Sequence, residues 1–300
     1  MRAAGRGPNA RFERNQAKNS VCEAMPEMDH ENQAYWAPPA MPYLELRTTS
    51  GSRRPYAPHF HTGLFSVGII LDGRTQVHLG AADYSAEPGD IVLIAPGQVH
   101  SCNPVAGAPR SYHMLHLDEA WCRERGGDAF SREGELRTRR TVVRDPELFR
   151  LLCRLTDALQ TGENAYERIF ADLVGDLMRK YCLAASGEMR APPDKLRPKD
   201  ALRADMEGKL SVLELARREG VRRETFQRSF RGATGLPPGM YHHCLRLEHA
   251  RRLLRQGMTI AEAAVCAGYA DQSHFHRMFV RFYSLTPGRY KKNMSHSYKK

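Results

Sequence analysis

Residues 210–290 contain one pattern written twice, and this repeat constrains the fold more than any other feature of the chain. The first halves of the two copies are 48 positions apart, and they pair Ser211 with Thr259, Glu214 with Glu262, Ala216 with Ala264, and Gly220 with Gly268. The second halves are 49 positions apart, and they pair Phe226 with Phe275, Arg228 with Arg277, Phe230 with Phe279, and Leu236 with Leu285. A repeat marks a supersecondary unit, and two copies are too few for a solenoid.

Each copy has the signals of two short helices separated by a turn. Ser211 followed by Glu214 predicts a capping box at a helix start. Gly220 predicts the end of that helix, because glycine takes the left-handed conformation at little cost. Phe226 and Phe230 predict the buried face of a second helix. One such unit is as typical of a plain helical hairpin as of a helix-turn-helix, but two in matching order favour DNA binding.

Residues 200–292 resemble the DNA-binding domain of AraC/XylS-family transcription regulators, which has two helix-turn-helices joined by a long helix. The resemblance is carried by Ala263, Ala264, Gly268, Tyr269, Asp271, Gln272, Ser273, Phe275, Arg277, Met278, Phe279, Leu285, Thr286, Pro287 and Tyr290. Two residues depart from the family pattern. Arg222 stands where serine usually caps the first recognition helix, and Ser284 stands at a position where many members have glycine.

The positive charge is confined to the same region. Residues 195–300 hold 22 Lys and Arg against 9 Asp and Glu, whereas residues 1–194 hold 23 against 25. Basicity restricted to one domain predicts a polyanionic partner, here double-stranded promoter or operator DNA. A uniformly basic solvated surface would not be segregated in this way.

The cysteines, the apolar runs and the N-terminal segment indicate where in the cell the protein acts. Seven cysteines without a CxxC pair predict reduced thiols and a cytoplasmic protein. The sequence has no apolar run of membrane-spanning length and no secretory signal, so we expect no membrane partner. Residues 1–35 are polar and without periodicity, which predicts a disordered tail; the true start could be Met25 or Met28.

Residues 42–118 read as short strands separated by Gly and Pro turns, which predicts a barrel or sandwich. The stretch resembles the cupin-like effector domain of the same family through His59, His61, Gly89, Pro96, Gly97, His100 and Asn103. The resulting fold prediction is α+β with two domains: a cupin-like β-barrel with accessory helices, then an all-α double helix-turn-helix.

The barrel histidines admit three interpretations. A small pocket needs a few polar groups to orient a ligand, so we predict an effector site formed by His59, His61, Phe65, His78 and His100. Three imidazoles also suit a transition metal, but Phe65 and Ser66 stand where the cupin pattern has glutamate. We therefore expect no metal or other cofactor. The third interpretation is that these histidines are merely satisfied on the barrel surface.

Residues 145–184 predict two amphipathic helices that pack on the barrel and, by the resemblance, form a homodimer interface. The predicted domains are a disordered tail 1–35, an effector-binding and dimerisation domain 36–185, a linker 186–198, a DNA-binding domain 199–292 and a basic tail 293–300. The Pro-rich linker further predicts that residues 195–300 fold without the barrel.

In each unit the Phe pair fixes which face of the second helix is buried, and the exposed side chains match base-edge chemistry. The predicted base-reading residues are Glu224, Thr225, Gln227, Arg228, Gln272, Ser273, His276 and Arg277. The predicted phosphate contacts are Arg231, Arg251, Arg252, Arg255, Lys291 and Lys292.

These observations predict a ligand-responsive, sequence-specific transcription regulator that is not an enzyme. It would take a small-molecule effector in the barrel and place two helix-turn-helices in adjacent major-groove segments, with RNA polymerase as a further candidate partner. One alternative is a cupin-type metalloenzyme fused to a DNA-binding domain, which would need a metal or general base in the barrel. Another is an architectural protein that binds DNA with little sequence preference.

Overall fold

The N-terminal half of the protein is built from antiparallel strands, as alternating sequence and Gly/Pro turns predict. In this computed structural model the described residues are 33–38, 40–130, 134–161, 166–185, 199, 201–203 and 211–296. The predicted linker and nearly all of the predicted disordered tail lie outside them.

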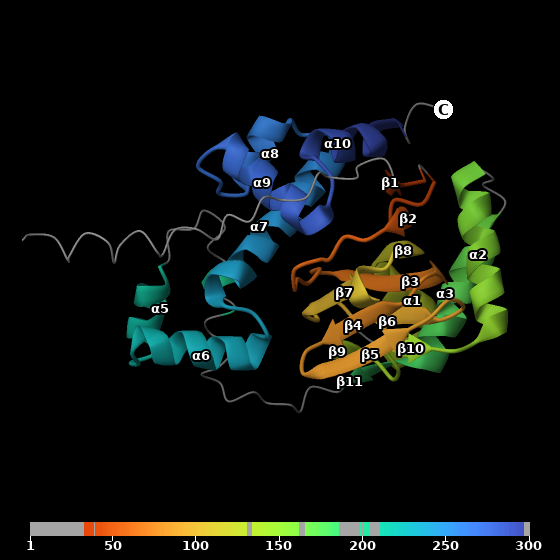
Figure 1. Ribbon diagram of the computed structural model, residues 1–300, viewed down its shortest axis with the longest axis horizontal. Helices are drawn as coiled ribbons and strands as arrows, with labels where there is room; N and C mark the ends of the chain where they lie inside the picture. Colours follow the sequence, from red (N-terminus) through yellow and green to blue (C-terminus); the bar gives the residue numbers. More distant parts are fainter. Residues whose placement is uncertain are drawn as a thin grey trace, which may run out of the picture. The chain divides into compact units, whose positions relative to one another are not determined.

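The strands form two main sheets and a small third one (Figure 1). The six-stranded sheet has the order β1 (Gln33–Trp36), β2 (Leu44–Ser52), β8 (Arg110–Asp118), β3 (Leu64–Asp72), β6 (Ile91–Ile94), β10 (Val142–Val143). The three-stranded sheet has the order β5 (Ala82–Ala86), β4 (Thr75–Leu79), β7 (His100–Pro104). The third sheet pairs β11 (Cys182–Ala185) with β9 (Glu135–Thr138).

The turn after β3 needs glycine for two reasons. Gly73 has a φ of +71°, which L side chains rarely adopt. A Cβ at this position would also lie 2.3 Å from the backbone oxygen of Pro109. Asp72-Gly73 is a sequence signal for a hairpin, but the structure contradicts this: the turn joins β3 in the six-stranded sheet to β4 in the three-stranded sheet, and the two strands do not pair.

Each face of the six-stranded sheet has its own apolar core. One face packs on helices α1 (Glu119–Gly126), α2 (Pro146–Thr161) and α3 (Glu167–Tyr181), as Figure 1 shows. The other face joins the three-stranded sheet in a smaller core of Ile70, Val77, Ala86, Val92, Ile94, Tyr112 and Met114. Two 3-10 turns, Val105–Gly107 and Asp128–Phe130, complete this half.

The C-terminal half is helical and contains both predicted helix-turn-helices. The first is α5 (Val212–Arg218) with α6 (Arg223–Thr234), and the second is α8 (Ile260–Cys266) with α9 (Gln272–Tyr283). The joining helix is α7 (Pro238–Arg255), and α10 (Pro287–His296) follows. Both predicted capping boxes are present, at Ser211 and Thr259. None of the helices among the described residues is long and apolar enough to cross a membrane.

The core of the helical half extends into the β-rich half. Tyr35, Ala37 and Phe60 belong to the same buried cluster as the four phenylalanines of the repeat. The ring of Phe60 lies 4.6 Å from that of Tyr241 on α7, measured between centroids. The described residues accordingly belong to one compact unit.

Candidate functional site

Helices α6 and α9 each present one polar face, because a phenylalanine pair buries the opposite one. The ring centroids of Phe226 and Phe230 are 5.8 Å apart, and those of Phe275 and Phe279 are 5.5 Å apart. Of the predicted base-reading residues, the fully exposed ones are Glu224, Arg228, Gln272, Ser273, His276 and Arg277. Thr225 and Gln227 are half-buried. The two faces offer hydrogen-bond donors and acceptors suited to base edges.

The two units differ at the start of the second helix. Asp271 caps α9, since its carboxylate accepts a hydrogen bond from the backbone N of His274 at 2.7 Å. Arg222 occupies the same position before α6 and makes no side-chain cap. Ser284, which stands where many family members have glycine, ends α9 with a φ of 58°, in the left-handed region that glycine adopts at little cost.

The predicted phosphate contacts fall into three groups by exposure. Arg231, Arg252 and Lys292 are exposed, and Arg255 and Lys291 are half-buried. Arg251 was predicted to face phosphates, and the structure contradicts this. Its side chain is only 3% exposed, because its guanidinium binds two buried carboxylates instead of facing solvent.

Those carboxylates form a buried network between the sheet and the helices. Arg251 donates to Glu45 on β2 at 2.9 Å and to Glu248 on α7 at 3.2 Å. Glu45 also accepts from the hydroxyl of Tyr290 at 2.7 Å. The hydroxyl of Tyr283 donates to Glu248 at 2.7 Å. Burial alone raises the pKa of Glu248, but Arg251 and His61 outweigh it and lower this pKa to about 2.

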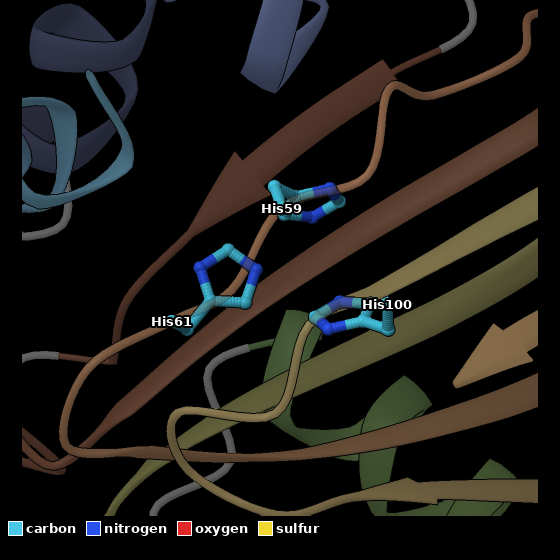
Figure 2. A group of neighbouring side chains, drawn as sticks. All are labelled: His59, His61 and His100. Carbon is cyan, nitrogen blue, oxygen red and sulfur yellow. The ribbon is translucent and has the colours of Figure 1, made fainter. Parts of the chain in front are cut away.

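The structure brings three of the predicted effector residues together. His59 and His61 lie in the loop between β2 and β3, and His100 begins β7; Figure 2 shows the three rings gathered side by side. One ring nitrogen from each lies within 4.8 Å of the other two. The backbones of His59 and His100 hold each other through two hydrogen bonds of 2.9 and 2.8 Å.

All three imidazoles have the same hydrogen-bond pattern. Nδ1 of His59 bonds to the carbonyl oxygen of Ala57 at 2.8 Å, and Nδ1 of His100 bonds to that of Gln98 at 2.9 Å. Nδ1 of His61 bonds to the Glu248 carboxylate at 2.8 Å. Because these oxygens only accept, each Nδ1 carries a proton, and Nε2 is the ring nitrogen left without a bond to them.

The charge state of the cluster follows from its surroundings. Burial, with His61 and Arg47 nearby, lowers the pKa of His100 to about 3. Burial and the neighbouring histidines also hold the pKa of His59 well below its usual value. Both rings are therefore neutral at physiological pH.

Two predicted effector residues lie elsewhere. Phe65 is fully buried in the core between the sheet and its helices, on the opposite face of β3 from Ser66, whose hydroxyl bonds to His116. Side chains alternate along a strand, so Phe65 cannot face the histidine cluster. His78 is paired with Asp83 on the neighbouring strand, and its side chain is 45% exposed. The structure separates both from the three clustered histidines.

The sequence did not mark two arginines that fill the space between the main sheets. Arg47 donates to the hydroxyl of Tyr112 at 2.9 Å, and Arg110 donates to the hydroxyl of Thr75 at 3.1 Å. Neither forms an ion pair with a described residue. The face of the Tyr112 ring lies within 5.2 Å of both guanidinium carbons. The one available signal was alternation along β2, which puts Glu45 and Arg47 opposite the core residues Leu44 and Leu46.

Comparison with known families assigns both halves. The family described as "AraC-like ligand binding domain" matches residues 42–174. The family described as "Helix-turn-helix domain" matches residues 215–293. The clustered histidines lie in the first range and both recognition helices in the second.

Relatives span most of the chain. An uncharacterized HTH-type transcriptional regulator of Bacillus subtilis (strain 168), YbfI, is 26% identical over 77% of this chain and 86% of its own length. The transcriptional activator NphR of Rhodococcus sp is 25% identical over 76% of this chain and 70% of its own. The crystal structure of ToxT from Vibrio cholerae has a TM-score of 0.51 and 12% identity, over 84% of this chain and 98% of that one. The last comparison supports the two-domain fold.

Proposed function

The chain belongs to the AraC/XylS family of transcription regulators, and from this premise we propose how it reads DNA and where it receives its signal. The observation that carries the proposal is the pair of polar recognition faces on one polypeptide. The joining helix α7 has 18 residues, a length of about 27 Å. Successive major-groove segments on one side of DNA are about 34 Å apart, so two recognition helices joined in this way suit adjacent segments.

Within each recognition helix we assign the main base contact to the arginine that the repeat places identically, Arg228 on α6 and Arg277 on α9. Both are exposed, and neither is held by an ion pair to a described residue. An arginine can donate two hydrogen bonds to one guanine, a contact that discriminates by about 1–3 kcal/mol. Exposed Arg231, Arg252 and Lys292 are better placed for phosphates, which carry no sequence information.

We propose that the effector binds at the histidine cluster. His59, His61 and His100 converge beside the helical half, and His61 is bonded to Glu248 on the joining helix. A ligand that displaces or reorients His61 therefore acts directly on α7, to which both recognition helices are attached. Differential contacts of this kind are what allow a ligand to shift a two-state equilibrium.

We also propose a homodimer through α2, with RNA polymerase as a partner at the promoter and the cytoplasm as the site of action. The apolar face of α2 packs on the sheet, but Leu151 remains 36% exposed on its outer face. Two tethered DNA-binding domains gain effective concentration without a new contact.

The experiment is selection of binding sites from a random DNA pool by the full-length protein. We expect a consensus of two conserved blocks about one helical turn apart. Arg277→Ala should weaken the selected site about 10- to 200-fold and relax one base position. Arg252→Ala is the matched control, and it should weaken all DNA alike. Arg277→Ala with unchanged sequence preference would contradict the assignment of α9 to the groove.

A further inference from the structure

The three clustered histidines have an arrangement that an organic ligand does not require. Each imidazole is fixed through Nδ1 to an oxygen acceptor, which leaves Nε2 for a ligand, and one ring nitrogen from each lies within 4.8 Å of the other two. Of the residues that the structure describes, none donates a hydrogen bond to these Nε2 atoms.

The oxygen atoms bonded to the three Nδ1 atoms are of the kind that metal-binding histidines use. A ligating imidazole nearly always donates its other N–H to a backbone carbonyl or a carboxylate, which fixes the tautomer and ring orientation. His59 and His100 use carbonyls, and His61 uses the Glu248 carboxylate. We propose that His59, His61 and His100 bind one divalent transition-metal ion of the Zn²⁺, Co²⁺ or Ni²⁺ class, and that this ion is the effector. This rests on the regulatory function proposed above.

The donor set selects the class of ion. Neutral imidazoles suit late first-row transition metals, whereas Mg²⁺ and Ca²⁺ take oxygen ligands. Three nitrogen ligands also leave a fourth position for water or a further ligand, as in other three-histidine sites. The glutamate that the cupin pattern supplies to such a site is absent here, and its place in the sequence is taken by Phe65 and Ser66. Glu248 instead supplies negative charge from outside the ligand set.

The spacing of the rings predicts that binding requires movement. The ring nitrogens lie up to 4.8 Å apart. Tetrahedral coordination at about 2.0–2.1 Å brings ligand nitrogens to about 3.4 Å from each other. The rings must therefore approach by about an ångström, and we infer that His61 takes part, by moving relative to Glu248 or by carrying it along.

Glu248 connects that movement to the DNA-binding half. The oxygen Oε1 that holds His61 also accepts from the hydroxyl of Tyr283, the last residue of recognition helix α9. The other oxygen, Oε2, holds Arg251 on α7. Contraction of the histidine cluster thus acts on the joining helix and on one recognition helix through a single carboxylate.

The first test measures binding by the untagged full-length protein. Titration with CoCl₂ should give visible d–d bands at one Co²⁺ per chain, without the sulfur-to-metal charge transfer that cysteine ligation produces. His59→Ala and His100→Ala should abolish these bands, and His78→Ala, a barrel histidine outside the cluster, should retain them. His100 is buried, so thermal unfolding of both cluster variants is first recorded without metal to check that they fold. If His100→Ala is unfolded, the test relies on His59→Ala, because His59 is only half-buried. Equal Co²⁺ affinity in wild type and His59→Ala would overturn the site.

The second test measures coupling to DNA. A fragment selected by the wild-type protein is titrated in EDTA and in excess Zn²⁺, and we expect affinities that differ at least tenfold. Glu248→Gln should lower Zn²⁺ affinity by about 10- to 100-fold. Zn²⁺ bound at the cluster with no change in DNA affinity would overturn its role as effector. Failure to select any DNA sequence, with Co²⁺ bands intact, would instead refute the proposed function and leave the metal site standing.

Discussion

Replacing Arg251 by alanine should destabilise the whole protein and leave the DNA contacts in place. The guanidinium lies between Glu45, which is fully buried, and Glu248, which is 3% exposed. Arg251→Ala would leave two buried carboxylates without their main counter-charge. Each keeps hydroxyl or imidazole partners, namely Tyr290 for Glu45, and Tyr283 and His61 for Glu248.

Two estimates of the loss agree. Removing one partner of a buried ion pair costs about 3–5 kcal/mol. The pKa of Glu248 offers a second measure: despite the opposing effect of burial, Arg251 and His61 lower it from 4.5 to about 2. A shift of that size corresponds to about 3 kcal/mol in favour of the ionised form, a net value to which Arg251 and His61 both contribute. We therefore expect a loss of about 3 kcal/mol or more in the free energy of unfolding.

The assay is urea unfolding followed by far-ultraviolet circular dichroism and by the fluorescence of Trp36 and Trp121, which lie in the β-rich half. Arg252→Ala is the control, because Arg252 is next to Arg251 in the sequence but its side chain is exposed. We expect this variant to change the free energy of unfolding by no more than about 0.5 kcal/mol. In DNA binding we expect the opposite ranking of the two variants. Arg252→Ala should reduce the salt dependence of DNA affinity by about one released counterion, and Arg251→Ala should leave it unchanged. An Arg251→Ala variant as stable as Arg252→Ala would refute the buried network.

Three smaller changes test local features. Ser284→Gly should raise stability by about 0.5–1 kcal/mol by relieving a positive φ, whereas Ser284→Ala should not; thermal unfolding separates them. Arg222→Ser should stabilise the protein by about 1 kcal/mol, because serine can cap α6 and Arg222 does not; thermal unfolding also measures this change. Asp145→Asn should cost less than about 1 kcal/mol at pH 7. Lys180 and hydrogen bonds lower the pKa of Asp145, so this difference should persist above about pH 4 and vanish as pH falls further.

The helical half was predictable because its signals are local. A capping box, a glycine and two phenylalanines lie within twenty residues of each other, so Ser211 through Phe230 specify their own unit. The exposed faces of α6 and α9 followed from the same phenylalanines. The strands β3, β4, β6 and β8 were likewise visible from alternation and turn residues.

The interface between the halves was not predictable, because alternation reveals only which residues share a face. Glu45 and Arg47 lie opposite the core residues of β2 and would ordinarily face water. The sequence around Arg251 likewise does not distinguish it from an exposed arginine on a helix. Glu45 and Arg251 are buried by their contact with each other, between segments 206 residues apart in the sequence. Arg47 is bonded to Tyr35 and Tyr112, which are 12 and 65 residues away. No local pattern records such a contact.

The placement of Phe65 shows the complementary error. Phe65 stands in the sequence where the cupin pattern has a ligand-binding glutamate, but successive side chains on a strand point to opposite faces. Ser66, one residue later, is the one that bonds to His116 beside the cluster. Strand parity, rather than proximity in sequence, decides which side chain can reach a site.

The first described strand is bonded to the last segments of the chain, and this sets an order of events during synthesis. The hydroxyl of Tyr35 donates to the backbone oxygen of Tyr283, and the hydroxyl of Tyr290 donates to Glu45. At about 5–20 residues per second, the 245 residues between Glu45 and Tyr290 take about 12–50 seconds to translate. Throughout that interval β1 and β2 lack their partners on α9 and α10. A chain cut short before Arg251 would thus leave Glu45 without both Arg251 and Tyr290, and would be unstable before it could occupy a promoter.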